Sequence, residues 1–357
     1  MVHVRKPLNY TDSLPRQHTL TLDSKKAIKA CNTNNVGVIL MVSSAVSHHK
    51  EREAIRQSWT GILPFTWILV FFLGSTNDAI QQDSILEEGK NHDDIIQDSR
   101  FTDSYTNLTL KTLALMQWTQ EACKDAKFLL KIDDDMYLNI PKLLQVTSCI
   151  TEARRNMYIE KRSTSDVISY KQGNGYTAFD ACLPYRPYEM IHYFINAETR
   201  EYESYFFGGY LYQDVRADRN KNSKWYLDPT VYAPTFLPPF LSGTAYIMST
   251  NLIPHLLQEA KRSPIIELED VYISGILGSN TLKLKLSHID GWNRFRPQWN
   301  SLCLYREIIT AHGLSPPEIQ MMTASVNRLD LNECNTLLVY IMNLINSSLS
   351  SLFPRIT

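Results

Sequence analysis

The chain has 357 residues, with 36 lysines and arginines against 37 aspartates and glutamates, and 44% of its residues are hydrophobic. This is enough apolar material for a sizeable core, in one large domain or two small ones. The near-neutral charge gives no electrostatic reason to expect a nucleic-acid partner, and the sequence has no basic helix or RNA-binding signature.

The cysteines and sequons bear on the cellular compartment. An even number of widely spaced cysteines, without a Cys-x-x-Cys pair, argues against zinc. It is compatible with disulfides in a secretory compartment and equally with buried free thiols. Sequons at Asn9, Asn107 and Asn346 favour the secretory pathway. The six cysteines are Cys31, Cys123, Cys149, Cys182, Cys303 and Cys334.

No transmembrane or signal segment is visible in the sequence. The longest apolar stretch, Ile62 to Leu73, is about half as long as a bilayer requires. It is also interrupted by Pro64 and Thr66. We therefore expect either a soluble cytosolic protein or an N-terminus that is not the biological one.

Strands and helices are expected to alternate along the first part of the chain. Residues 1–34 are expected to form an exposed, stem-like leader with little patterning. Apolar runs then predict strands at Val36–Val42, Phe65–Leu73 and Ile95–Ile96. More polar segments between them predict helices at Lys50–Trp59 and Asp78–Gly89.

Three cations in the predicted helices are candidates for phosphate contacts. Arg52 and Arg56 are four residues apart and project from one helix face, which could instead be a solvated face. Ser104–Cys123 predicts a long, mostly apolar and buried helix that is interrupted by Lys111. A buried cation needs a partner, which is either a structural carboxylate or a ligand phosphate.

The next strand, Phe128–Ile132, ends in the carboxylates of Asp133, Asp134 and Asp135. A helix over Ile140–Ile150, started by a proline, follows this acidic loop. The alternation of strand and helix favours a parallel sheet covered on both faces, with ligands at the carboxyl ends of its strands. The acidic loop lies at such an end.

The second half of the chain is less regular. Residues 151–205, rich in charge, tyrosine and serine, are expected to form a long surface insertion without periodic structure. Ser242, Gly243 and Thr244 predict a tight turn leading into a strand over Ala245–Met248. Further helices are expected at Leu252–Arg262 and, packing on the domain, at Leu337–Ile345.

Two acidic points suggest a metal-assisted transfer reaction. Three adjacent carboxylates repel one another unless a cation lies among them, and oxygen ligands suit magnesium and manganese. Glu269 and Asp270 offer a second acidic point that could supply a base. The alternatives are an acidic turn capping the following helix and a charge pair at a helix N-terminus. An EF-hand fails, because the loop lacks the central glycine and the closing glutamate.

Seven short segments, in this order, resemble the β-1,3-galactosyltransferase family. Together they span about residues 36–325, and seven in order is a specific signal. They are Arg52–Trp59, Phe71–Gly74, Asp103–Thr112, Lys131–Asp135, Ser223–Tyr226, Ser242–Tyr246 and Glu269–Tyr272.

The resemblance implies a GT-A type glycosyltransferase, an α/β protein whose Rossmann-like mixed sheet is flanked by helices. It further implies a UDP-sugar donor, Mn²⁺ or another divalent cation, inversion at the anomeric carbon, and a type II membrane anchor in the lumen of the Golgi apparatus. By the same resemblance, Asp135 ligates the metal and Asp133 faces the nucleotide-sugar. Asp270 is the catalytic base, and His312 completes the metal site unless it is an ordinary surface or core histidine.

The expected reaction transfers a hexose, galactose or an N-acetylhexosamine, to the 3-hydroxyl of a glycan acceptor on a glycoprotein or glycolipid. The alternative is a catalytically silent member that binds glycan or nucleotide-sugar. We assign donor binding to Arg52, Arg56, Lys111, Asp133 and Asp134. Acceptor contacts or supporting roles are assigned to Trp225 (otherwise a packing aromatic), Ser242, Gly243, Thr244 and Glu269.

The resemblance and the sequence pattern together give the expected domain boundaries. A catalytic domain over residues 35–330 contains the 151–205 insertion and is followed by a tail over 331–357. The chain departs from the family in two places. The stretch between Asp135 and Tyr210 is about 30–40 residues longer than usual, and Leu241 stands where many members have a cysteine.

Overall fold

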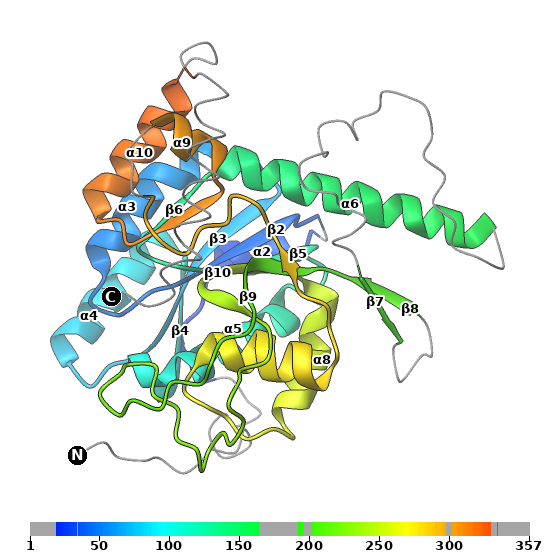
Figure 1. The fold of residues 1–357 in the computed structure, drawn as a ribbon. Helices are drawn as coiled ribbons and strands as arrows, with labels where there is room; N and C mark the ends of the chain where they lie inside the picture. The colour runs from blue at the N-terminus through cyan, green and yellow to red at the C-terminus, as the bar shows by residue number, and fades with distance from the viewer. Residues whose placement is uncertain are drawn as a thin grey trace.

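The structure is a computed structural model that describes residues 19–33, 35–163, 192–195, 202–297, 302–329 and 334. Within these residues the central sheet has eight strands, in the order β1-β4-β3-β2-β5-β10-β9-β11, with helices on both faces (Figure 1). The sheet is mixed, because β2, β3, β4 and β5 run parallel while β10 is antiparallel to both β5 and β9. The expected α/β fold with a mixed, helix-flanked sheet is confirmed.

The element bounds agree with most of the expected strands and helices. The strands are β1 Leu20–Leu22, β2 Val38–Ser43, β3 Trp67–Ser75, β4 Ile95–Thr102, β5 Phe128–Asp133, β6 Met136–Leu138, β7 His192–Ile195, β8 Tyr202–Tyr205, β9 Phe207–Tyr212, β10 Phe240–Ser249, β11 Ser287–His288 and β12 Thr310–His312. The α-helices are α2 Lys25–Cys31, α3 His49–Trp59, α4 Ala79–His92, α5 Leu108–Ala122, α6 Ile140–Ser163, α8 Ile253–Ala260, α9 Leu302–Glu307 and α10 Pro316–Arg328. Short 3-10 turns are η1 Thr60–Ile62, η2 Tyr105–Asn107 and η4 Thr250–Leu252, and η5 Val271–Thr281 is a π-type helix.

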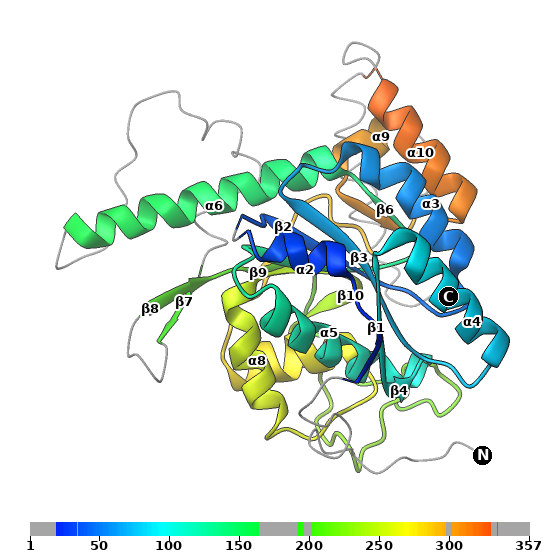
Figure 2. The same ribbon diagram turned by 180° about the vertical axis from the view of Figure 1, so that it is seen from behind.

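The central strands are mostly apolar because both faces of the sheet are covered, and the buried Lys131 of β5 is an exception. In β2, Ile39 and Met41 belong to one hydrophobic core, whereas Val38, Leu40 and Val42 belong to the other. Helices α2, α5 and α8 pack in the first core, and α3, α4 and α6 pack in the second (Figures 1 and 2). Successive side chains of a strand point to opposite faces, so a doubly covered strand needs a near-continuous apolar run.

Part of the expected leader belongs to the folded domain. Strand β1 pairs antiparallel with β4 at the edge of the sheet, and α2 follows it. A disulfide joins Cys31, at the end of α2, to Cys123, just after α5. The unpatterned leader that we expected over residues 1–34 is therefore wrong for the segment from Leu20 to Cys31.

The disulfides resolve the alternative that the sequence left open. Besides Cys31–Cys123, a second disulfide joins Cys303 to Cys334, and Cys149 is also disulfide-bonded. No cysteine in the described part of the chain is a free thiol. These cysteines are cross-links, as in proteins of an oxidising compartment.

The expected insertion over residues 151–205 contains regular structure. Helix α6 continues through Ser163, and β7 pairs antiparallel with β8. The expected helix at Leu337–Ile345 lies outside the described residues. Among the residues that are described, no helix is both long and apolar enough to cross a membrane.

The expected turn at Ser242-Gly243-Thr244 is wrong, because these residues lie inside strand β10. The pairing of β10 with β9 shifts register between Leu241 and Tyr246, as at a β-bulge. Bulges re-aim backbone groups and often lie beside functional sites. The glycine thus marks an irregularity within a strand rather than the start of one.

Helices α3 and α4 are joined by a buried ion-pair network. The Arg52 guanidinium donates to both carboxylate oxygens of Glu88 at 2.8 Å, and its side chain has no exposed surface. Arg56 donates to both oxygens of Asp94 at 2.8 Å and also pairs with Glu88. Burial alone would raise the pKa of Glu88, but the hydrogen bonds and charges of its partners, Arg52 first, lower it to about 2.

We predict that Glu88→Gln lowers the free energy of unfolding by about 3–5 kcal/mol, because it leaves buried arginine charge without its partner. The folded-state pKa of Glu88 lies below its ordinary value of 4.5. Its stabilisation is therefore complete above about pH 4.5 and is lost as the pH falls towards about 2. Urea unfolding of the wild type and the variant, from pH 7 down to pH 3, measures both effects.

The matched control is Glu87→Gln, which removes an exposed carboxylate from the same helix and should leave stability unchanged. A wild-type midpoint for Glu88→Gln at pH 7 would contradict a stabilising role for this network.

Candidate active site

A carboxylate–histidine cluster lies at the carboxyl end of β5. Asp133 ends β5, and Asp135 follows in the short turn before β6. Strand β12 pairs antiparallel with β6, with His312 opposite Met136, and so brings the imidazole beside the turn. The backbone N–H of Leu314 also donates to the carbonyl of Asp135 at 2.9 Å. Two distant parts of the chain thus meet at one edge of the sheet.

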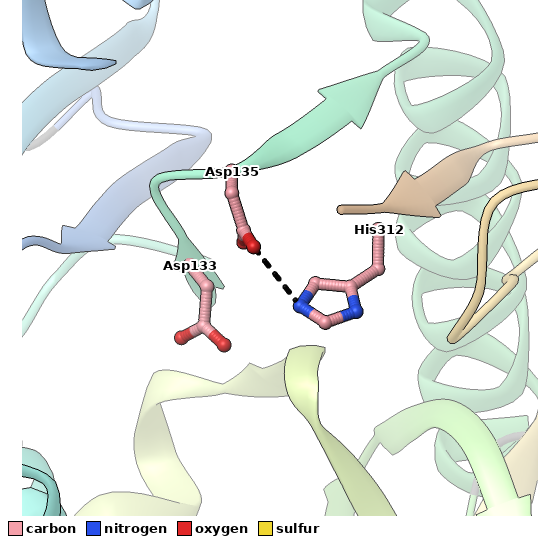
Figure 3. Close-up of side chains that lie close together, drawn as sticks. All are labelled: Asp133, Asp135 and His312. Atoms are coloured by element: carbon pink, nitrogen blue, oxygen red, sulfur yellow. Dashed lines mark ion pairs between the residues drawn. The ribbon is translucent and has the colours of Figure 1, made fainter. Parts of the chain in front are cut away.

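The side chains of Asp133, Asp135 and His312 converge (Figure 3). One ligand atom from each lies within 4.8 Å of the others, and His312 Nε2 lies 3.2 Å from Asp135 Oδ2. All three are partly exposed, so a ligand could reach them. Carboxylate oxygens suit magnesium and manganese, and imidazole suits transition metals. The donor set therefore fits a manganese-type cation.

Opposite charges offset the cost of placing these groups together. Burial, and the nearby charge of Asp135, raise the pKa of Asp133, although Lys131 and His312 act against this. Burial, the largest single effect, would raise the pKa of Asp135, but the hydrogen bond and charge of His312, with smaller contributions from a backbone hydrogen bond and Lys131, together lower it. Burial, the largest single effect, would lower the pKa of His312, but the hydrogen bond and charge of Asp135 and the charge of Asp133 together raise it. Each of these two side chains thus favours the charged form of the other, at the 3.2 Å that separates them.

Asp134 lies apart from this cluster. Its carboxylate is buried and lies 2.9 Å from Nδ1 of His48, the residue just before α3. The middle aspartate of the triplet thus connects the loop to a neighbouring helix.

The second acidic point lies at the start of η5, beside β10. Asp270 caps this helix: its Oδ1 accepts from the N–H of Val271 at 2.8 Å. Its Oδ2 accepts from the N–H of Gly243 at 3.1 Å. A Cβ on Gly243 would lie 3.1 Å from Oε2 of Glu269 and 3.2 Å from Cβ of Asp270, so a larger residue here would push these side chains by a few tenths of an ångström. Asp270 thus lies at a helix N-terminus, and its carboxylate is partly exposed.

Glu269 differs from its neighbour in being buried. Tyr246 donates its phenolic O–H to Oε1 of Glu269 at 2.6 Å. Burial raises the pKa of Glu269 to about 7, with Lys131 acting against it and Asp270 adding to it. Burial likewise raises the pKa of Asp270, against the backbone hydrogen bonds from Val271 and Gly243. Asp270, the more accessible carboxylate, is the better placed to meet a substrate.

The two acidic points share one edge of the sheet. Strand β10 runs antiparallel to β5 with Ala245 opposite Ile132, so Gly243 lies at the end of β5 that carries Asp133. Lys131 joins them: its Nζ donates to Oδ1 of Asp133 at 2.6 Å and to the carbonyl of Gly243. Sequence reasoning missed Lys131, although a lysine in a buried strand is itself a signal.

Tyr105 is a second residue that sequence reasoning missed. It lies in η2, before α5, and its side chain is 54% exposed. Partial burial and the negative charges of Asp270, Asp133 and Glu269 raise the pKa of its phenol. Its hydroxyl is therefore in electrostatic range of both acidic points.

The expected donor contacts at Arg52, Arg56 and Lys111 have other partners. The two arginines belong to the buried α3–α4 network. The alternative that they lie on a solvated helix face is therefore wrong. Lys111 donates to Asp103 at 2.9 Å and to the carbonyl of Ser44 at 2.6 Å. Its partner is thus a structural carboxylate, and we leave all three cations out of the site proposed below.

The remaining assignments fall on β10 and on the segment before it. The Ser242 and Thr244 hydroxyls are 3.1 Å apart, on either side of Gly243. Trp225 lies 41% exposed in the connection between β9 and β10, with Lys224 Nζ 4.6 Å from its ring centroid. It is a surface aromatic rather than a packing residue.

Comparison with known proteins agrees with this architecture. The family model described as Galactosyltransferase matches residues 50–185 and 180–290. Mouse and human beta-1,3-galactosyltransferase 1 are each 28% identical over 293 residues, covering 81% of this chain and 73% of theirs. Human beta-1,3-galactosyltransferase 5 is 28% identical over 294 residues, covering 80% of this chain and 77% of its own. The chain belongs to the galactosyltransferase family of glycosyltransferases, as its motifs indicated.

We predict that Asp135→Asn weakens Mn²⁺ binding by at least about 100-fold. Loss of a residue that only supports a metal ligand can already cost about 100-fold in metal affinity, and Asp135 is a proposed ligand itself. The substitution removes one of two carboxylates in the proposed ligand set and the partner of His312. Isothermal titration of the purified protein with Mn²⁺ gives the dissociation constant.

Asp134→Asn is the matched control, because that carboxylate pairs with His48 and not with the cluster. It should bind Mn²⁺ with the wild-type constant. Wild-type affinity in Asp135→Asn would remove Asp135 from the proposed metal site.

Proposed function

We propose that this chain transfers galactose from UDP-galactose to the 3-hydroxyl of a glycan acceptor, with inversion at the anomeric carbon. Membership of the galactosyltransferase family supports the donor, and the printed names of the relatives support the linkage. The observation that carries the proposal is the convergence of the Asp133–Asp135–His312 cluster and Asp270 at one edge of the sheet. An N-acetylhexosamine donor would require different contacts in the sugar pocket.

The two acidic points would have different roles. Asp133, Asp135 and His312 would hold a divalent cation, which supplies Lewis-acid neutralisation of the departing diphosphate. Asp270 would act as general base, taking the proton of the acceptor hydroxyl. That oxygen forms the new bond to the anomeric carbon while the bond to UDP breaks on the opposite face. One displacement of this kind inverts the configuration and needs a single base.

The hydrogen bonds of Asp270 suit this role. Each carboxylate oxygen accepts one backbone N–H, from Val271 or from Gly243, which fixes the orientation of the group. A carboxylate oxygen has a second lone pair, so either oxygen can still accept the acceptor's proton. Backbone donors also favour the ionised form that a base requires.

We also propose that the protein acts in the lumen of the Golgi apparatus, held at the membrane by an anchor. The disulfides Cys31–Cys123 and Cys303–Cys334 support an oxidising compartment. Glycan acceptors on glycoproteins or glycolipids would be met there.

We predict that Asp270→Asn lowers kcat by about 10²–10⁴-fold, the usual contribution of a general base, and leaves UDP-galactose affinity unchanged. The amide keeps the shape of the side chain but cannot take the proton. Glu267→Gln, which removes an exposed carboxylate nearby, is the control and should retain full activity. Transfer by Asp270→Asn at a near wild-type rate would show that another group is the base.

We further predict that the purified protein transfers sugar from UDP-galactose in preference to other UDP-sugars, and only with a divalent cation present. A panel of UDP-sugars with simple β-linked acceptors, assayed with Mn²⁺ and again after chelation, tests both points. Preference for an N-acetylhexosamine donor would revise the substrate, and activity that survives chelation would contradict the metal role. Donor binding without transfer to any acceptor would instead favour a catalytically silent binding protein.

A further inference from the structure

Lys131 occupies an unusual position in the sheet. It lies within β5, is 3% exposed and faces Tyr246 across the antiparallel pair with β10. Lysines are almost never fully buried unless they are paired, because an isolated charge is costly to remove from water. The partners of its ammonium group should therefore show why a lysine stands there.

Both partners of Lys131 belong to the candidate active site. Its Nζ donates to Oδ1 of Asp133 at 2.6 Å and to the carbonyl oxygen of Gly243. The same Gly243 residue donates its N–H to Oδ2 of Asp270 at 3.1 Å. The hydrogen bonds of Lys131 and the backbone of Gly243 thus link a carboxylate of the metal-type cluster to the carboxylate of the proposed base.

The charge of Lys131 also suits this position. Its Nζ forms an ion pair with Asp133 at 2.6 Å, and Glu269 lies within electrostatic range of it. Lys131 also acts electrostatically on Asp135 and Asp270. A positive charge among these carboxylates reduces their mutual repulsion without occupying the partly exposed cluster itself.

We propose that Lys131 is a positioning residue that sets the spacing and orientation of Asp270 relative to the metal-type cluster, through Asp133 on one side and Gly243 on the other. The inference rests on the proposed function, because it assigns Asp270 as the base. The proposal implies that Lys131 supports turnover but weakens cation binding. Its ammonium group already donates to an oxygen of Asp133, and its positive charge repels a metal cation. A residue needed only for folding would support both.

Lys131→Met separates these two roles. The variant should lower kcat by about 100-fold, as expected when a reacting group is displaced by about 1 Å. It should bind Mn²⁺ more tightly than the wild type, by about tenfold, because a nearby like charge is gone. The KM for UDP-galactose should change little. Isothermal titration with Mn²⁺ and steady-state kinetics at saturating Mn²⁺ provide the three numbers.

Two variants complete the comparison. Lys131→Arg keeps the charge and the donors, so its kcat should return to within about tenfold of the wild type. Lys127→Met, at an exposed position just before the same strand, is the matched control and should leave kcat and Mn²⁺ affinity unchanged.

Gly243→Ala tests the other half of the hydrogen-bond chain and keeps the proposal falsifiable if Lys131→Met does not fold. The added methyl would press on Asp270 and Glu269, at 3.1–3.3 Å from their atoms. It should lower kcat by about 100-fold and leave Mn²⁺ affinity at the wild-type value. Wild-type kcat in this variant would overturn the proposal.

The proposal and the proposed function fail in different ways. A folded Lys131→Met protein with wild-type kcat, or with Mn²⁺ binding weaker than the wild type, would overturn the role of Lys131. A wild-type protein that transfers galactose to no acceptor would instead contradict the proposed function. The Mn²⁺ titration would still decide whether Lys131 opposes cation binding, because it requires no turnover.

Discussion

Negative charge gathered at the carboxyl end of β5 is the constraint on which the site depends. Asp133, Asp135, Glu269 and Asp270 converge there from β5, the following turn and the start of η5. Carboxylates this close are stable only when cations or hydrogen-bond donors lie among them. Lys131, His312 and the backbone N–H groups of Val271 and Gly243 fill that need. Strand β10 runs antiparallel beside β5 and contributes one of these donors, the N–H of Gly243.

Much of the fold could be predicted from local sequence pattern, because a strand buried on both faces is mostly apolar. Strands β2, β3 and β5 are such runs, and the structure places them side by side. Elements whose burial depends on distant partners were less predictable. The segment Leu20–Cys31 shows little pattern, yet it is held by pairing with β4 and by the disulfide to Cys123.

In the candidate site, too, some residues could be placed from local pattern and others could not. Asp133 and Asp135 follow directly from a strand end, where ligands gather in α/β sheets. The positions of His312 and Asp270 depend on long-range pairing, β12 with β6 and β10 with β5, which no local period encodes. The resemblance to a family, and not periodicity, assigned their roles. For Arg52 and Arg56 the shared helix face was predictable, but the carboxylates opposite them lie in and just after another helix.

The disulfide between Cys31 and Cys123 has a practical consequence for any shortened form of this protein. A chain cut at residue 35, the start of the expected catalytic domain, would lose the edge strand β1, helix α2 and this cross-link. The outer edge of β4 would be unpaired, and Cys123 would be a free thiol next to the core. An exposed strand edge is a template for aggregation. A shortened form that keeps both the pairing of β1 with β4 and this cross-link therefore begins ahead of Leu20.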